Sequence, residues 1–481
     1  MGDNLKEKTA SGLMWGAINN GTSQILNLVI GIFLARLLTP ADYGIVGVLA
    51  IFSAIGASLQ SSGLLPALIN LKSPTTRDYN SVFWFNMSIS LLLYAILFFC
   101  APLIADFFHQ PCLVWVSRIM FLGLPIQALG IANLAYMRKN MMNREIAIVY
   151  VTALFLSGVT GITLAYYDFS YWSLVGQQLV NVGLISLGQF YFVPWFPSLK
   201  IDTEPVRQML GFSVKLMITS VINALNFHVL TFVFGRFLPI QAVGYYSQAN
   251  KWSNMAKTTI AEAVGQVVQT VMVSVADEHD RELRVFRKLT RFTAFLSFPA
   301  LLGLALVAHE FILLTIGPKW EESVLLLQIL CIGAAFLPFY TLYQNVAISH
   351  GRSGIYMWCN IAQMALTLAL VLVLYKQGIV AIVWGYSIFT ILWLIVWHLS
   401  TGRLIGLHLL DVIKDTIPFF MIALAVMIAT HFLTQGIDNL LILLVVRIVI
   451  AAGLYLGTMK LLRAKILEES IEFILKKKRK L

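Results

Sequence analysis

Long apolar segments recur along the whole chain, and they constrain its fold more than any other feature. A helix that crosses a bilayer needs about 20 mostly apolar residues, and about fourteen segments reach that length. Their approximate limits are 12–37, 43–67, 82–107, 113–137, 146–167, 171–193, 211–237, 243–271, 289–315, 322–349, 354–375, 379–399, 411–434 and 440–462. This pattern predicts an all-α protein that crosses the membrane many times.

The composition fits a protein that lies almost entirely within the membrane. Of the 481 residues, 59% are hydrophobic and only 12% are charged, whereas charged residues make up about 25% of a soluble domain. No long polar stretch separates the apolar segments, so we expect no soluble domain and only short outer loops. The first segment lacks a small-residue cleavage site, so we expect it to remain as the first membrane helix.

Lysine and arginine residues gather in every second connection between the apolar segments. If the N-terminus is cytoplasmic, the cytoplasmic connections hold most of them, and the opposite connections hold little beyond Lys319 and Lys376. This asymmetry predicts an even number of spans with both termini in the cytoplasm. The net charge of +11 is therefore spread over many loops, which argues against a nucleic-acid partner. The one dense run, 476–480, is predicted to anchor the tail on anionic lipid.

An internal repeat divides the chain. The segment from Leu34 to Gly44 ends one apolar segment with an arginine and opens the next, and a similar segment begins at Phe234. The matched positions include Arg36 with Arg236, Gly44 with Gly244, Leu124-Pro125 with Leu337-Pro338, and Gly176 with Gly385. The repeat predicts two pseudo-symmetric lobes of six helices each, in the same orientation. The predicted divisions are an N-terminal lobe at 1–199, a C-terminal lobe at 200–400, an appended helix pair at 401–465 and a basic tail at 466–481.

The eighth apolar segment carries the most polar face. On a helix, one stripe of this segment contains Lys251, Thr258, Glu262 and Gln269, and a second stripe about 100° away contains Asn250, Asn254 and Lys257. A polar face this wide is not expected to contact lipid, because ionisable groups inside spans usually face a protein interior or a water-filled cavity. We therefore expect Lys251, Lys257, Asn250 and Asn254 to bind an anionic substrate. The alternative is a structural role for the lysines, in which Lys251 pairs with an acid on a neighbouring helix.

Five further ionisable residues are candidates, each with an alternative. Arg36, Arg236 and Arg118 are candidates for substrate binding, but they lie near helix ends, where such side chains also reach the lipid headgroups. Glu262 is either an ion-coupling carboxylate or a counter-charge to the lysines. His228 is either an ion-coupling group or a histidine packed in the protein core.

The sequence contains no pattern typical of an enzyme. There is no phosphate-binding loop of the type that hydrolyses ATP and no catalytic constellation. The four cysteines are scattered, without the spacing of metal ligands. We therefore expect no cofactor, no metal and no enzymatic activity.

Three motifs together carry a resemblance to a known family. They are the Arg36–Gly44 segment, Gly244–Asn250 and Ile316–Trp320. The chain resembles the polysaccharide flippases of the multidrug/oligosaccharidyl-lipid/polysaccharide exporter superfamily, in particular the lipopolysaccharide and colanic-acid exporters. The resemblance implies two six-helix lobes around a central cavity, plus two appended helices. It also implies a multi-pass protein of the bacterial inner membrane that opens alternately to either side.

The cargo implied by the resemblance is undecaprenyl-diphosphate-linked oligosaccharide, moved from the inner to the outer leaflet for surface polysaccharide synthesis. Membrane lipids are further expected partners, and the glycan polymerase and chain-length machinery are candidate partners. The coupling ion, H⁺ or Na⁺, stays open. A diphosphate needs cationic partners in a low-dielectric region, which arginine and lysine supply.

Two alternatives remain. A multidrug or cation antiporter of the same fold would need intramembrane acids, whereas the eighth segment has two lysines and one glutamate. A membrane polysaccharide polymerase or ligase would need a large outer loop with catalytic residues.

Overall fold

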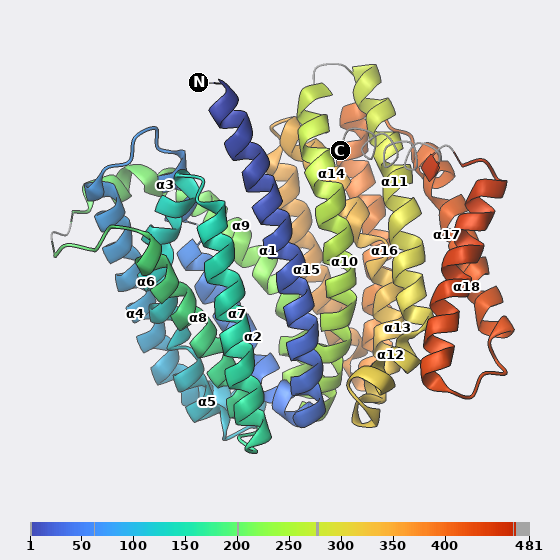
Figure 1. Ribbon diagram of the computed structural model, residues 1–481, viewed down its shortest axis with the longest axis horizontal. Coiled ribbons are helices and arrows are strands. Elements are labelled where there is room, and N and C mark those ends of the chain that lie inside the picture. Colours follow the sequence, from blue (N-terminus) through green and yellow to red (C-terminus); the bar gives the residue numbers. More distant parts are fainter. Residues whose placement is uncertain (1, 62, 200–201, 276–278, 465, 468–481) are drawn as a thin grey trace. The chain divides into compact units, whose positions relative to one another are not determined.

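The structure, a computed structural model, describes residues 2–61, 63–199, 202–275, 279–464 and 466–467 (Figure 1). All regular secondary structure in these residues is helical, which confirms the predicted all-α class. The chain forms two compact units, Met1–Gly244 and Tyr245–Leu481. The basic run at 476–480 lies outside the described residues.

Twelve helical stretches in the described residues are long and apolar enough to cross a membrane. The two other predicted spans also form helices, α8 (Trp172–Phe192) and α10 (Ile240–Val275), but their sequences are too polar to meet the same criterion. The predicted count of about fourteen thus consists of twelve apolar stretches and two polar helices. Polar helices of this kind are found inside a membrane protein, shielded from lipid, and the crossing of the bilayer by α8 and α10 stays a prediction.

The proline-marked repeat corresponds to a helix break that occurs twice. The fourth predicted span consists of α5 (Leu113–Met120) and α6 (Gly123–Lys139), and the tenth consists of α13 (Glu322–Ala334) and α14 (Leu337–Ser349). Proline cannot donate a backbone hydrogen bond and clashes with the preceding turn of a helix. The helix therefore restarts just before the proline in both repeats.

The first unit contains the helices from α1 to α9. Those not yet given are α1 (Gly2–Leu37), α2 (Pro40–Ser61), α3 (Leu64–Asn70), α4 (Thr76–Phe108), α7 (Asn143–Tyr166) and α9 (Glu204–Phe237). In this unit α1 lies against α7, α8 packs on α6 and α7, and α9 packs along α2. Leu68, Val82 and Ala135 are fully buried where α3, α4 and α6 meet. The compact unit extends beyond the predicted boundary at 199 because α9 packs on α2 and α4, and the lobe division stays a prediction drawn from the repeat.

The segment between α1 and α2 shows why the Leu34–Gly44 motif takes its form. The α1 helix ends at Leu37, and α2 begins at Pro40. Proline is well suited to the first position of a helix, because its missing N–H has no partner there. The carboxylate of Asp42 accepts hydrogen bonds from the Thr39 backbone N–H at 2.8 Å and from its hydroxyl at 2.6 Å, which fixes the turn.

The second unit contains most of α10 and the helices up to α18. Those not yet given are α11 (His279–Leu306), α12 (Ala308–Thr315), α15 (Ser353–Leu374), α16 (Ile379–Thr401), α17 (Leu409–Leu433) and α18 (Leu440–Leu461). Within it, α16 packs on α13 and α15, and α17 packs along α11 (Figure 1). The appended pair, α17 and α18, therefore contacts the unit through α11 and α12.

Candidate functional site

A row of polar side chains runs along α10. The Lys257 ammonium donates a hydrogen bond to the amide oxygen of Asn254, and Asn254 Nδ2 donates to Asn250 Oδ1 at 2.7 Å. Spacings of three and four residues place these side chains on one side of the helix. The structure thus brings together three of the predicted binding residues. An amide oxygen positions the ammonium without adding an opposing charge.

Lys251 lies on an aromatic surface of the same helix. Its Nζ atom is 5.3 Å from the centroid of the Trp252 ring, a distance at which a cation is attracted to the ring face. Trp252 is itself buried, with its ring 5.2 Å from that of Phe311. The half-buried lysine is therefore held by a fixed ring, and no ion pair to it is present in the described part of the chain.

The two predicted ion-coupling residues lie in different helices. Glu262 is exposed on α10. His228 is half-buried on α9, with its ring 4.8 Å from that of Phe227. Their roles in coupling stay predictions.

Arg236 and Arg118 lie in the first unit, where each contacts residues of α4. Arg236 Nη1 donates to the carbonyl oxygen of Phe107 at 2.6 Å and contacts the ring of His109. These residues form the end of α4, where the helix carbonyls lack partners and carry partial negative charge. Arg118 lies over the ring of Phe98, 4.3 Å from its centroid. Arg36 is exposed at the end of α1, and substrate binding by all three stays a prediction.

The polar residues of α8 are used inside the first unit. Gln178 lines a cavity of about 220 Å³ together with Ser53 of α2 and Gln127 of α6. Asn181 Nδ2 donates to the Ser157 hydroxyl of α7 at 3.1 Å. These contacts explain why α8 is too polar to face lipid.

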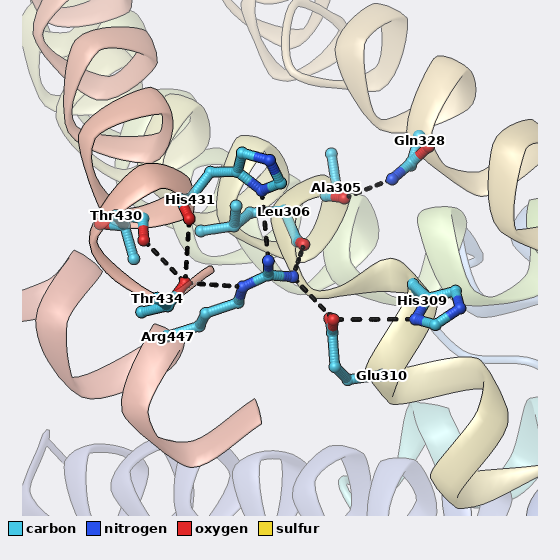
Figure 2. Close-up of polar contacts among 9 residues, drawn as sticks. All are labelled: Ala305, Leu306, His309, Glu310, Gln328, Thr430, His431, Thr434 and Arg447. Carbon is cyan, nitrogen blue, oxygen red and sulfur yellow. Dashed lines mark hydrogen bonds and ion pairs between the residues drawn. The ribbon is translucent and has the colours of Figure 1, made fainter. Parts of the chain in front are cut away.

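The sequence analysis missed a buried ion pair in the second unit (Figure 2). Arg447 of α18 donates from Nη1 to Glu310 Oε1 of α12 at 2.7 Å. Arg447 is 7% exposed and Glu310 only 2%, so both charges are removed from solvent. A buried ion pair needs additional hydrogen bonds to offset desolvation, and Thr434 Oγ1 supplies one by accepting from Arg447 Nε at 3.2 Å.

A second group of ion pairs joins α17 to α11 at the opposite end of α17. Arg287 Nε donates to Asp415 Oδ2 at 2.7 Å, and Arg287 also lies 3.3 Å from Asp411. Arg291 approaches Asp415 at 3.8 Å. The appended pair is therefore tied to the rest of its unit at both ends.

A signal for the missed pair was present in the sequence. Glu310 lies in the ninth predicted span and Arg447 in the fourteenth, so each apolar segment contains a charge that needs a partner. The two residues are 137 positions apart, and sequence spacing does not indicate that they meet.

The described residues contain no group of three or more His, Cys, Asp or Glu side chains arranged to hold a metal ion. The four cysteines are free thiols.

Comparisons with known proteins decide the family. The family described as "Polysaccharide biosynthesis protein" matches residues 33–325, which is more than half of the chain. The chain belongs to this family. The lipopolysaccharide biosynthesis protein WzxC of Escherichia coli (strain K12) is 27% identical over 335 residues, covering 68% of this chain and 67% of that protein. The succinoglycan biosynthesis transport protein ExoT of Rhizobium meliloti (strain 1021) is 25% identical over 345 residues, covering 72% of this chain and 70% of that protein.

A solved structure shares the fold of this polysaccharide biosynthesis protein. The lipid II flippase MurJ in an inward closed conformation aligns with a TM-score of 0.77 over 94% of this chain and 100% of that chain, at 16% identity. The polytopic helical fold is thereby confirmed, and the family match together with the two relatives confirms the resemblance to polysaccharide exporters. The chain is a multi-pass membrane protein.

Proposed function

We propose that the chain is a flippase that moves undecaprenyl-diphosphate-linked oligosaccharide from the inner to the outer leaflet by alternating access. It would serve the synthesis of a surface polysaccharide: lipopolysaccharide, capsule or exopolysaccharide. The cargo joins an apolar tail, a dianionic diphosphate and an oligosaccharide, so a carrier needs cations and amide groups within the membrane.

The observation that carries the proposal is the composition of α10. This helix presents Lys257, Asn254 and Asn250 as a hydrogen-bonded row, with Lys251 held on Trp252. Lysine is a compact cation that suits a phosphate, and amides suit sugar hydroxyls. The α10 helix is too polar to count among the twelve apolar stretches, and its polar side chains are of the kinds that the proposed cargo requires.

The relatives support the same class of cargo. WzxC is named for lipopolysaccharide biosynthesis and ExoT for succinoglycan transport, and both names refer to polysaccharides. The shared fold with the lipid II flippase supports a lipid-linked substrate.

The test is flipping of a fluorescent undecaprenyl-diphosphate oligosaccharide by the full chain in proteoliposomes. We expect the double substitution Lys251→Ala and Lys257→Ala to reduce flipping by at least about tenfold, because charge-assisted contacts to the diphosphate are lost. Replacing both residues by arginine keeps the charges and should retain most of the flipping.

Lys376→Ala is the matched control, because this exposed lysine also lies on an aromatic ring, that of Tyr375, but outside α10. It should flip cargo like the unaltered chain. Full flipping by the double alanine variant, with normal insertion, would contradict the binding role of the two lysines.

The proposed location is the bacterial inner membrane, with both termini in the cytoplasm. The distribution of lysine and arginine among the loops supports this orientation. A membrane-impermeant thiol reagent applied to whole cells should label Gln377→Cys and not Asn140→Cys, since these exposed positions lie on opposite sides in the proposed topology. The reverse labelling would contradict it.

Coupling to an ion gradient is proposed for Glu262 and His228. The exposed carboxylate of Glu262 on the polar helix α10 supports a cation-binding role. Glu262→Gln should abolish the acceleration of flipping by an imposed H⁺ or Na⁺ gradient while leaving gradient-free flipping. An unchanged gradient response in both Glu262→Gln and His228→Gln would exclude these residues as the coupling groups.

A further inference from the structure

The buried arginine of the appended pair uses all three of its nitrogen atoms (Figure 2). Arg447 Nη1 donates to Glu310 Oε1 at 2.7 Å and to the Leu306 carbonyl at 3.3 Å, Nε donates to Thr434 Oγ1 at 3.2 Å, and Nη2 contacts His431 Nδ1 at 3.2 Å. The second carboxylate oxygen of Glu310 is buried and has no hydrogen-bond partner within the described residues. The cluster thus contains an acceptor that the protein leaves open.

The contact between Arg447 and His431 sets the hydrogen-bonding role of the imidazole nitrogen. A guanidinium is always protonated and only donates hydrogen bonds. Nδ1 of His431 must therefore accept in this contact, which requires a lone pair on that atom. A proton on Nδ1 would remove the acceptor and place two positive charges about 3 Å apart in a region of low dielectric.

His309 lies on the other side of the ion pair, next to Glu310. Its Nδ1 atom lies 3.7 Å from Glu310 Oε1, the oxygen that Arg447 also uses. A protonated His309 adds a second positive charge beside this carboxylate, which offsets part of the attraction between Glu310 and Arg447. Protonation of either histidine therefore weakens the contact between Arg447 and Glu310.

We propose that His431, Arg447, Glu310 and His309 form a proton-binding site, in which protonation of the two histidines releases the ion pair that holds α18 against α12. The proton acceptors are accessible, because His431 is exposed and His309 is partly exposed, whereas the ion pair between them is buried. His431 also lines one end of a groove of about 620 Å³ between α11, α13, α16 and α17, which gives its ring space to turn away from Arg447.

The surrounding helices add no other charge in contact with the cluster among the described residues. The α11 helix contributes the backbone carbonyl of Leu306, and α13 contributes the neutral amide of Gln328, which donates to the Ala305 carbonyl at 3.3 Å. The α12 helix contributes His309 and Glu310, α17 contributes His431, and α18 contributes Arg447. The response to acid is therefore set by these four side chains.

This site goes beyond the proposed function, because its ligand is a proton and its residues lie outside the polar row of α10. In the proposed orientation the link between α17 and α18 is extracytoplasmic, so the site would sense the pH outside the cell. The conformational test below uses no cargo, and its outcome is independent of whether the chain flips oligosaccharide.

The experiment measures the accessibility of the buried face of α18 in purified full-length protein in nanodiscs. In a cysteine-free background, Ala451→Cys places a thiol one turn from Arg447 on the buried face, and Ala452→Cys places one on the exposed face. The ratio of their rates with a thiol reagent cancels the effect of pH on thiol chemistry. Between about pH 7.5 and about pH 5.5, where histidine titrates, we expect this ratio to rise at least about fivefold, the lower end of typical coupling between sites.

Three variants decide the origin of the response. His431→Gln together with His309→Gln keeps a hydrogen-bond acceptor at position 431 and removes both titrations, so the ratio should stay low at both pH values. Glu310→Gln removes the charge that holds Arg447, so the ratio should be high at both. The Gln328→Leu control should respond to pH like the unaltered chain.

A ratio that does not change with pH in the unaltered chain would overturn the proposal. So would a double histidine variant that responds as the unaltered chain does. Since the histidine variants leave the ion pair itself intact, they keep the test decisive even if Glu310→Gln does not fold.

Discussion

Gly44 of α2 packs against Ile240, the first residue of α10, and Gly244 of α10 packs against Pro40, the first residue of α2. A Cβ atom on Gly44 would lie 2.1 Å from the carbonyl oxygen of Ile240, where α10 begins. A Cβ atom on Gly244 would lie 1.8 Å from the carbonyl oxygen of Pro40, where α2 begins. The two copies of the repeated motif thus contact each other reciprocally, and each contact requires the absence of a side chain.

Gly44→Ala and Gly244→Ala should each destabilise the protein, because the added methyl group meets backbone atoms, which cannot rotate away. Overpacking of this kind costs about 1–3 kcal/mol and occasionally more. Thermal unfolding in detergent, together with the yield of monodisperse protein, measures the effect. Gly453→Ala is the matched control, since a Cβ atom there meets nothing within 4 Å and alanine favours a helix by about 1 kcal/mol. Equal stability of Gly244→Ala and Gly453→Ala would contradict the reciprocal contact.

Arg236 should matter more for stability than for cargo. Its guanidinium binds the Phe107 carbonyl and the His109 ring at the end of α4. Arg236→Met should lower the free energy of unfolding by about 1 kcal/mol, the range for a cation at a helix C-terminus, and should leave flipping per folded molecule near normal. Flipping by the protein that remains folded separates the two roles. If flipping is lost while the unfolding temperature is unchanged, the arginine binds cargo.

Much of the fold follows from local features of the sequence. The length of apolar segments predicts the helices, and Pro125 and Pro338 mark a break that the structure shows in both repeats. The row from Lys257 to Asn250 was also predictable, because spacings of three and four residues determine which side chains meet on one helix.

Contacts between distant helices were not predictable in the same way. Arg447 and Glu310 are recognisable as charges in apolar spans, but no spacing rule joins residues 137 positions apart. Arg236 appeared to be a candidate for cargo binding because it repeats Arg36, and only the structure shows that it meets the end of α4. Likewise, only the structure shows that Gln178 of α8 shares a cavity with the polar residues Ser53 of α2 and Gln127 of α6.

The link between α8 and α9 contains Asp202, and its contact with Arg77 of α4 should persist throughout the neutral pH range. Arg77 pairs with Asp202, and the backbone N–H of Glu204, with help from Arg77, holds the pKa of the Asp202 carboxyl below its usual value. A carboxyl with a lowered pKa contributes stability above its unfolded-state pKa and loses it as the pH falls through the folded-state pKa. Proteolysis of the link should therefore be constant from about pH 6 to 8.

Asp202→Asn should speed this proteolysis at neutral pH, and high salt should reduce the difference because the ion pair is exposed. The Trp84 ring also holds the link, since its Nε1 donates to the Ser198 carbonyl at 2.6 Å, so we expect a modest acceleration only. Cleavage that is the same in the variant and in the unaltered chain would show that the ion pair does not hold the link.

The buried pair of Arg447 and Glu310 should show strong coupling in a double-mutant cycle. Arg447→Met leaves the Glu310 carboxylate buried without a partner, and Glu310→Met does the same to the guanidinium, so each should cost about 3–5 kcal/mol. The double variant removes both charges and should be close to the unaltered chain in stability, since an apolar replacement of similar volume is often neutral. Denaturant unfolding in detergent near neutral pH measures the stability of all four proteins.

A parallel cycle on Arg287 and Asp415 is the comparison. Arg287 is 32% exposed, so this cycle should give weaker coupling because solvent screens that pair. Equal coupling in both cycles would mean that burial does not determine the strength of the Arg447 contact.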